Sequence, residues 1–519
     1  MTSWCGCFTI IVVKNHRSCL VALLVWTCSL AASRGEELSS LISRHWFAAR
    51  TPHFQTYSCG LTQEVARLTA RLEQFRMAYE ALAGTQAVAS PPIEVIALPD
   101  HESLKRFVPL YQGQPVNLSG FFHRGSDENL IVLSLTKDGS DALQTIFHEY
   151  AHLLLRRNQQ FWPMWLNEGM ADIYATFEVT GEHAARVGKP QEIYLSILAN
   201  EPLAPLSALF AVTHDSPEYN ERERQGMFYA ESWLLTHYLV IGNAARRAGL
   251  GELTGLLKQG QTPEQAFTNA FRTPLSVMER EVARYAKQGR YESLGLAVRA
   301  SLLGPQPMAT RDVSPAEICF RLGDELLRVG RGGEAESLFL RARKLAPASP
   351  LSWEGLGLLA SERGQHEEAV ENLRQAIGHG STSFLAHYAY AREKLTLSAP
   401  APDTYTRLEK PAAAEVRGEL ETALRLMPEF GPAQHLLGFF ELIQGEDLGS
   451  AVRHLEKAMA LEPDNPVYPL TLAEVQLAER NPTAARRTLE PLCRPYVNAK
   501  LRAHAEEMLK GIGAAARDQ

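Results

Sequence analysis

Two histidines near the middle of the chain have the spacing of ligands to one metal ion. In the stretch IFHEYAHLLL, residues 146–155, His148 and His152 are four residues apart. Side chains at this spacing lie on one face of a helix, about 5–6 Å apart. A catalytic zinc site needs a third protein ligand and an open position for water. Glu149 lies beside the first histidine and could take a proton from that water, so the pattern HExxH indicates hydrolytic chemistry.

The residues around this motif predict the helix that it needs. Apolar residues recur at helical spacing through residues 143–154, whereas the two histidines line a second face. Asp141 fits the first turn, and the arginines at 156–157 suit the negative end of the helix dipole. We expect a helix over about 141–157 and a second helix after Pro163.

The second stretch, WLNEGMADIY at residues 165–174, supplies a third ligand. Glu168, Asp172 and Ala175 share one face of the second helix. If this helix packs across the first one, the Glu168 carboxylate can reach the metal. Two imidazoles and one carboxylate are a ligand set of catalytic zinc.

HEYAH followed by WLNEGMAD resembles the gluzincin metallopeptidases, whose third zinc ligand is a glutamate on the helix after HExxH. The family's fold is a thermolysin-like domain with a small mixed sheet and a helical part. Carboxylates and amides around the ligands fix the orientation of metal-bound imidazoles. The resemblance assigns six residues to one Zn²⁺ site: the ligands His148, His152 and Glu168, the catalytic base Glu149, and Asn167 and Asp172, which orient the imidazoles.

The resemblance also implies a hydrogen-bond donor for the reaction's oxyanion on a later helix. The segment 227–240, MFYAESWLLTHYLV, predicts an amphipathic helix. Tyr229 follows Glu168 by about sixty residues, as the tyrosine of gluzincin aminopeptidases does, and is our candidate donor, with His237 and Tyr238 as rivals. Aromatic packing between helices is the alternative role. The sequence with which aminopeptidases hold a free amino terminus is not found before HEYAH, which argues against that subtype.

The metal motif also has a structural interpretation. HExxH matches arise by chance, and a pair of histidines on an apolar helix is often structural. A zinc site that only supports a fold needs no base and is usually closed by a fourth Cys or His. The presence of Glu149 and Glu168 therefore favours catalysis. The rival class is an inactive repeat scaffold with a vestigial or structural metal domain.

Composition limits the remaining classes of function. A chain of 519 residues is too long for one core, so we expect two or three domains. The net charge of −7 comes from interspersed acidic and basic residues, which gives no electrostatic case for nucleic acid. Outside residues 1–33 only Cys59, Cys319 and Cys493 remain, too scattered for a disulfide framework.

The N-terminal residues 1–33 predict a signal peptide. Lys14 and Arg17 precede a short apolar run at 19–30, and small residues follow at 31–33. A membrane helix needs about 20 apolar residues, so the run is short for an anchor. We expect an exported protein, periplasmic or secreted, with an uncleaved N-terminal membrane anchor as the alternative.

Residues 45–140 have a mixed α/β pattern. Alternating and apolar runs predict strands near residue 55, at 93–98 and at 129–135, and a long helix spans 62–82. The segment SGFFHRG before 129–135 predicts a hairpin with it. The 129–135 strand is either an edge strand to which an extended substrate adds or an ordinary buried strand.

The chain should be mostly helical over 141–300, which makes the fold class of the first 300 residues α+β. Beyond it, residues 312–512 predict an all-α solenoid of tetratricopeptide repeats. We expect a loop at 398–415 in the third unit and a capping helix at 499–512. Several small and apolar residues recur with a period of 34: Leu322, Gly323, Ala335, Phe339 and Ala342 return as Leu356, Gly357, Ala369, Leu373 and Ala376.

Together these patterns predict an exported zinc metallopeptidase, similar to the peptidase MA-like domains that precede tetratricopeptide repeats in bacteria. Glu149 would deprotonate a water held at the zinc, the water would attack a peptide carbonyl, and Glu149 would pass the proton to the leaving amine. The expected partners are a peptide or protein substrate and a protein bound by the repeats, unless the solenoid is a spacer. We expect membrane contact only through residues 1–33.

Overall fold

The structure is a computed structural model in which contacts divide the chain into two units. One contains Met1–Glu73, Ala89–Ala142 and Gln306–His454, and the other contains Gln74–Val88, Leu143–Pro305 and Leu455–Gln519. The predicted signal peptide lies outside the described residues, which are 38–83, 92–111, 113–125, 128–135, 140–159, 162–213, 216–220, 222–299, 301–302, 308–399, 405–463, 465–494, 497 and 499–515.

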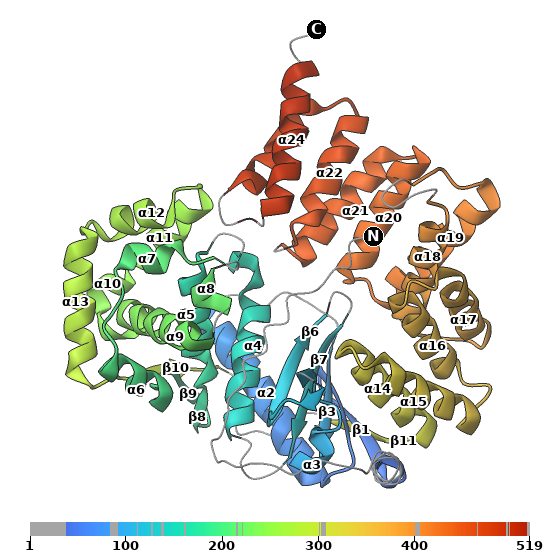
Figure 1. Ribbon diagram of the computed structural model, residues 1–519, viewed down its shortest axis with the longest axis horizontal. Coiled ribbons are helices and arrows are strands. Elements are labelled where there is room, and N and C mark those ends of the chain that lie inside the picture. The colour runs from blue at the N-terminus through green and yellow to red at the C-terminus, as the bar shows by residue number, and fades with distance from the viewer. Residues whose placement is uncertain are drawn as a thin grey trace. The chain divides into compact units, whose positions relative to one another are not determined.

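The first unit is built on a six-stranded mixed sheet (Figure 1). Strands β2, β3 and β7 run parallel, and the other pairs are antiparallel. The predicted strands and the long helix α2 (Thr62–Ala83) are all present. In sheet order, the strands are β11 (Ala309–Val313), β1 (Trp46–Arg50), β2 (Phe54–Ser58), β3 (Ile93–Leu98), β7 (Asn129–Ser134) and β6 (Gly120–Arg124).

Two features of this sheet differ from the expectation. Strand β7 lies between β3 and β6, and five of its six residues are buried, so the proposal that 129–135 is an edge strand is wrong. Its hairpin partner β6 occupies that edge instead. The opposite edge strand, β11, was not expected, because ATRDV lacks the alternation of apolar and polar residues that marks a strand.

The first helical repeat packs on the sheet and shares its core. Helix α14 (Pro315–Arg328) buries Ile318 and Leu322 against a cluster that includes Ile96 and Val132 of the central strands. Helices α15 (Gly332–Leu345) and α16 (Pro350–Glu362) extend this cluster. Figure 1 shows α14 and α15 beside the sheet. The sheet and the start of the repeats therefore form a single folding unit.

Two ion pairs also join this repeat to the sheet. The guanidinium of Arg321 lies 2.7 Å from the carboxylate of Glu94 on β3, and that of Arg328 lies 3.0 Å from Glu128 beside β7. All four side chains are largely buried, so each charge requires its partner.

The remaining helices follow as antiparallel pairs. The expected loop at 398–415 is too long at its C-terminal end, because α19 already begins at Lys410. Helix α19 starts with the sequence KPAAAEV, in which a proline suits the first turn and the alanines favour helix. The pairs are α16 with α17 (His366–Gly378), α18 (Phe384–Leu397) with α19 (Lys410–Leu426), α20 (Gly431–Gln444) with α21 (Leu448–Leu461), and α22 (Val467–Ala478) with α23 (Pro482–Leu489), before the terminal helix α24 (Ala499–Ala515).

Glycines stand where neighbouring helices approach most closely. A Cβ atom at Gly323 would lie 2.6 Å from the ring of Phe339, and one at Gly355 would also overlap this ring. Phe339 on α15 is fully buried between α14 and α16. Gly323, which belongs to the period of 34, and Gly355, which does not, thus both make room for this ring.

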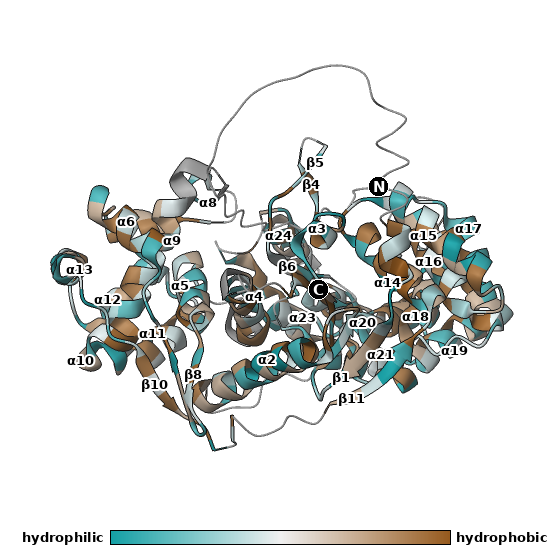
Figure 2. Ribbon diagram, turned by 90° about the horizontal axis from the view of Figure 1, so that it is seen from below, coloured by the Kyte–Doolittle hydropathy of each residue, from teal (hydrophilic) through white to brown (hydrophobic). Residues whose placement is uncertain are grey.

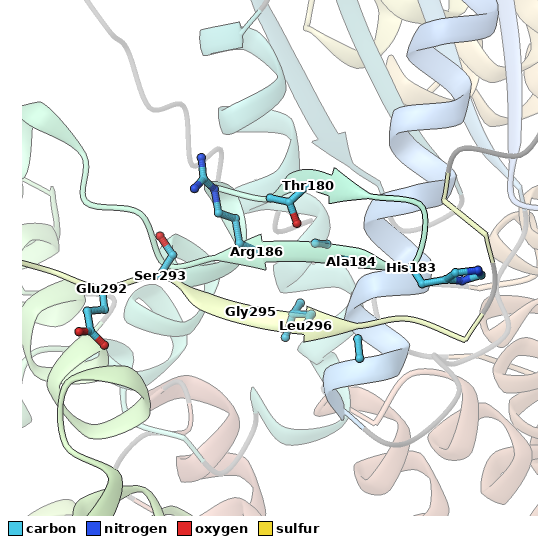
Figure 3. Close-up of a pocket in the computed structure, with 10 residues that line it drawn as sticks. Thr180, His183, Ala184, Arg186, Glu292, Ser293, Gly295 and Leu296 are labelled. Carbon is cyan, nitrogen blue, oxygen red and sulfur yellow. The ribbon is translucent and has the colours of Figure 1, made fainter.

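The second unit is mostly helical, as expected, and adds a small three-stranded sheet that was not expected. Its strands are β8 (Glu178–Gly181), β9 (Ala184–Val187) and β10 (Leu294–Ala297), in the order β10-β9-β8. Strand β10 is apolar (Figure 2), and a cavity of about 620 Å³ lies along the sheet (Figure 3). No helix among the described residues is long and apolar enough to cross a bilayer.

Gly355→Ala is expected to lower the free energy of unfolding of the repeat by roughly 1–3 kcal/mol, because the new methyl group overlaps Phe339. The control is Gly418→Ala in α19, where no atom lies within 4 Å of the added Cβ. This variant should be neutral or more stable, since alanine favours helix. Urea unfolding followed by circular dichroism measures both, and equal midpoints would contradict the packing argument.

Candidate metal centre

The first helix of the centre, α4 (Ser140–Gln159), is held by an aromatic cluster. Phe147 stacks on Phe75 of α2 at 4.5 Å between ring centroids. The hydroxyl of Tyr150 accepts a hydrogen bond of 3.3 Å from Arg76. These contacts fix the apolar face of α4, so the opposite positions of the helix carry His148 and His152. The boundaries agree with the predicted helix over 141–157 to within two residues.

The second helix, α5 (Met164–Ala175), begins directly after Pro163, as predicted. Eleven of its residues are buried, which explains why its sequence is apolar apart from the functional positions. Gly169 faces α9 (Arg222–His237), and a Cβ atom there would overlap Thr236 and the carbonyl of Ser232. The glycine of NEGMAD therefore lets α9 approach the centre.

Three ligand atoms from these helices meet at one point. The Nε2 atoms of His148 and His152 are 3.1 Å apart, and Oε2 of Glu168 lies 3.2 Å from the first and 3.3 Å from the second. In the described residues this is the only group of three or more metal-ligating side chains that meets so closely. His148 and Glu168 are buried, and His152 is half-buried.

These distances fit a zinc ion. Ligand bonds of roughly 2.0–2.1 Å in a tetrahedron place neighbouring ligand atoms about 3.3 Å apart. Two imidazoles and a carboxylate are also a donor set found in catalytic zinc sites. The residues present therefore fit the metal that the sequence predicts, although other divalent ions accept the same donors.

The charges around His148 favour a cation at this point. Burial opposes a positive charge on its ring, but the carboxylates of Asp172 and Glu168 outweigh burial and raise the imidazole pKa well above its usual value. Burial likewise opposes ionisation of Glu168, yet the two histidines lower the pKa of its carboxyl group. The two carboxylates thus favour positive charge at this point, whether a proton or a metal cation carries it.

Asp172 lies behind the first histidine. Its Oδ1 is 3.0 Å from Nδ1 of His148, on the opposite side of the ring from the other ligands. If Nδ1 donates this hydrogen bond, Nε2 presents its lone pair to the metal. The side-chain amide of Asn167 donates to the carbonyl of Trp162, at 3.3 Å. Its role in orienting an imidazole stays a prediction.

Glu149 is half-buried and follows His148 directly on α4. Successive residues of a helix are about 100° apart around its axis. The carboxylate of Glu149 therefore flanks the face that carries the two histidines without belonging to that face. This placement suits a base better than a fourth ligand.

The tyrosine candidates divide into two groups. Tyr229 on α9 is buried, and its ring centroid lies 6.4 Å from that of His148. His237 and Tyr238 are committed elsewhere: the first hydrogen-bonds to Tyr285 and to the carbonyls of Gly188 and Glu292, and the second hydrogen-bonds to Glu281 and Asn243. Of the three candidates, the structure brings only Tyr229 to the ligands.

A further tyrosine, Tyr219, was missed in the sequence. It lies on the short helix α8 (Pro217–Asn220), and its hydroxyl donates a hydrogen bond of 3.4 Å to Oε1 of Glu168. The rings of Tyr219 and Tyr229 are neighbours, with centroids 6.3 Å apart. Burial, with the charge of Glu168 and the contact with Tyr219, raises the pKa of Tyr229 well above its usual value, so its hydroxyl stays protonated.

Three family models match parts of the chain. One, described as a protein of unknown function (DUF1570), matches residues 142–248 and so contains the whole candidate centre. Two models described as tetratricopeptide repeats match residues 351–378 and 442–502. No curated protein matches the chain. The C-terminal part of the chain is a tetratricopeptide repeat domain.

Solved structures of other tetratricopeptide repeat (TPR) proteins resemble part of this chain. A thermophilic TPR protein of Thermus thermophilus is 24% identical, with 37% of this chain and 98% of that chain covered and a TM-score of 0.30. YrrB, described as a TPR protein with an unusual peptide-binding site, is 15% identical, with coverage of 37% and 92% and a TM-score of 0.30. A TPR protein from Parabacteroides merdae is 18% identical, with coverage of 39% and 76% and a TM-score of 0.30.

The purified protein is expected to hold one zinc ion per chain after dialysis, and His148→Ala and Glu168→Ala should each lose it, because two ligands are too few for tight binding. His183→Ala is the control, since this histidine is exposed on the β8–β9 hairpin. Metal analysis by mass spectrometry gives the stoichiometry. Equal zinc in wild type and His148→Ala would rule out this site.

Proposed function

We propose that this chain is an exported zinc-dependent peptidase whose TPR domain binds a protein or peptide partner. The proposal rests mainly on one observation: Nε2 of His148, Nε2 of His152 and Oε2 of Glu168 lie within 3.3 Å of one another in a buried site. Glu149 beside these ligands supplies the carboxylate that hydrolysis needs. Export rests on the sequence pattern of residues 1–33 alone.

In this proposal, the chain's own residues handle the protons. A bound zinc ion polarises a carbonyl and lowers the pKa of water towards 7. Glu149 takes the proton from the attacking water and gives it to the leaving amine, which is general acid–base work by one carboxylate. Asp172 holds the His148 ring in the orientation that presents Nε2. The half-buried position of Glu149 gives it access to water from outside the core.

Tyr229 and Tyr219 are the proposed hydrogen-bond donors to the oxyanion. Hydrolysis of a peptide passes through a tetrahedral state with negative charge on the carbonyl oxygen, and a fixed donor stabilises it. The Tyr219 hydroxyl donates to the carboxylate of Glu168, and the charge of the same carboxylate acts on the hydroxyl of Tyr229. The raised pKa of Tyr229 keeps its proton available at any physiological pH.

The TPR domain supports a protein-interaction role, because repeats of this class mediate binding of proteins or peptides. This is also the basis of a second candidate function, a TPR scaffold whose metal centre is only structural. It is favoured by the family models, since two of the three describe repeats and the third describes no activity. The two candidates differ in whether Glu149 does chemistry.

Glu149→Gln is expected to retain zinc and to lower hydrolysis of a peptide library by at least about 10²-fold, because the amide cannot take the proton from water. Glu201→Gln, at an exposed position after α6 (Glu192–Asn200), is the matched control and should cleave like wild type. Mass spectrometry of the digest gives the rates. Zinc-loaded wild type that cleaves nothing would favour the scaffold.

Tyr229→Phe is expected to lower kcat by about 10²–10³-fold with little change in KM, since the donor acts on the transition state. Tyr219→Phe tests the neighbouring hydroxyl in the same way. Tyr238→Phe is the control, because this hydroxyl is bonded to Glu281 and Asn243. If neither Tyr229→Phe nor Tyr219→Phe changes kcat, the oxyanion donor is not a tyrosine of this pair.

A further inference from the structure

The carboxylate of Asp172 is held from three directions. Its Oδ1 lies 3.0 Å from Nδ1 of His148 and accepts a hydrogen bond of 3.2 Å from the amide of Gln191. Its Oδ2 accepts a hydrogen bond of 2.9 Å from the hydroxyl of Tyr194. Asp172 is 2% exposed, so protein groups provide nearly all of its surroundings. A buried carboxylate with both oxygens engaged in this way has one orientation.

Gln191 and Tyr194 reach Asp172 from a segment outside the metal motif. They lie at the start of α6 (Glu192–Asn200), directly after the β8–β9 hairpin. The residue after the hairpin is Gly188, whose amide donates to the carbonyl of Ile173 on α5 at 2.9 Å. Gly188 has a φ of +81°, and a Cβ there would overlap Ile241, so only glycine fits.

His237 fixes the same point from α9. Its Nε2 lies 2.9 Å from the carbonyl of Gly188, and its Nδ1 lies 2.7 Å from the hydroxyl of Tyr285. Burial lowers the pKa of His237 to about 4, so the ring is neutral at physiological pH. The start of α6 is thus pinned to both α5 and α9, and Gln191 and Tyr194 are presented to Asp172 by a fixed backbone.

We propose that Gln191 and Tyr194 are positioning residues of the metal centre, which act on His148 through Asp172. The inference rests on the proposed zinc site and adds to it two residues that no sequence motif marks. By fixing the Asp172 carboxylate, the two donors fix the Nδ1–H tautomer of His148 and aim its Nε2 at the ion. Outer partners of ligating histidines contribute to metal affinity in this way.

The simpler alternative is that Tyr194 only packs. Its ring lies against Trp233 on α9, with centroids 6.2 Å apart. The chain offers a matched comparison in Tyr291, which also contacts Trp233, at 5.1 Å, but whose hydroxyl donates to the carbonyl of Ala286. Removing either hydroxyl keeps the ring, and only the removal at Tyr194 affects Asp172.

The test measures zinc affinity of the full chain by competition with a chromophoric chelator. Tyr194→Phe and Gln191→Ala are each expected to raise the zinc Kd by about threefold to tenfold. Tyr291→Phe should bind zinc like wild type. In the zinc-loaded protein, the Nδ1 proton of His148 should exchange faster with solvent in Tyr194→Phe, which proton NMR can follow. Circular dichroism checks folding, and Gln191→Ala carries the test if Tyr194→Phe does not fold.

A double-mutant cycle separates positioning from packing. Asp172→Ala should raise the zinc Kd by about 10–100-fold, and adding Tyr194→Phe to it should have no further effect if the hydroxyl acts through Asp172. A full additional effect in that background would overturn the inference, as would equal Kd values for Tyr194→Phe and Tyr291→Phe. In both cases the zinc site itself would stand. Wild type without zinc binding at His148 would overturn both the site and the inference.

Discussion

The candidate metal centre depends on burying two carboxylates beside two imidazoles. Glu168 and Asp172 are 3% and 2% exposed, and an isolated charge at such a depth would cost several kcal/mol. His148 lies between them, with Nδ1 towards Asp172 and Nε2 towards Glu168. One imidazole can carry at most one positive charge, so His148 balances only part of the negative charge of Glu168 and Asp172. A divalent cation held by Nε2 and Glu168 is the compensation that this arrangement fits.

This electrostatic requirement explains why both helices are held by close contacts. A displacement of either helix by a fraction of an ångström would separate charges that are stable only together. The stack of Phe147 on Phe75 fixes α4, and the absence of a side chain at Gly169 lets α9 hold α5 closely. Phe147, directly before HEYAH, and the glycine of NEGMAD are thus part of the same constraint as the ligands.

The sequence predicts that these side chains meet, because local periodicity determines which face of a helix a residue occupies. His148, His152 and Glu168 need only two helices and one crossing to meet, and Asp172 follows Glu168 by one helical turn. The residues of the site that could not be predicted from the sequence are placed by contacts between distant segments of the chain. Tyr219 lies on a four-residue helix without periodicity, and Tyr194 reaches Asp172 only because the β8–β9 hairpin ends at α5. The order of strands in a sheet also depends on contacts between distant segments. The apolar run of β7 therefore could not show that this strand lies inside the sheet.

The TPR domain shows this limit most clearly. The 34-residue period reveals the helical pairs, yet it says nothing about what the first pair packs against. In the structure, Ile318 and Leu322 of α14 complete the core under Ile96 and Val132, and β11 extends the same sheet. The first repeat therefore cannot be a detachable spacer, since removing it would expose an apolar sheet face to water. Because the first repeat shares the core of the sheet, a partner-binding surface on the repeats is best altered by single substitutions in later repeats rather than by deletion.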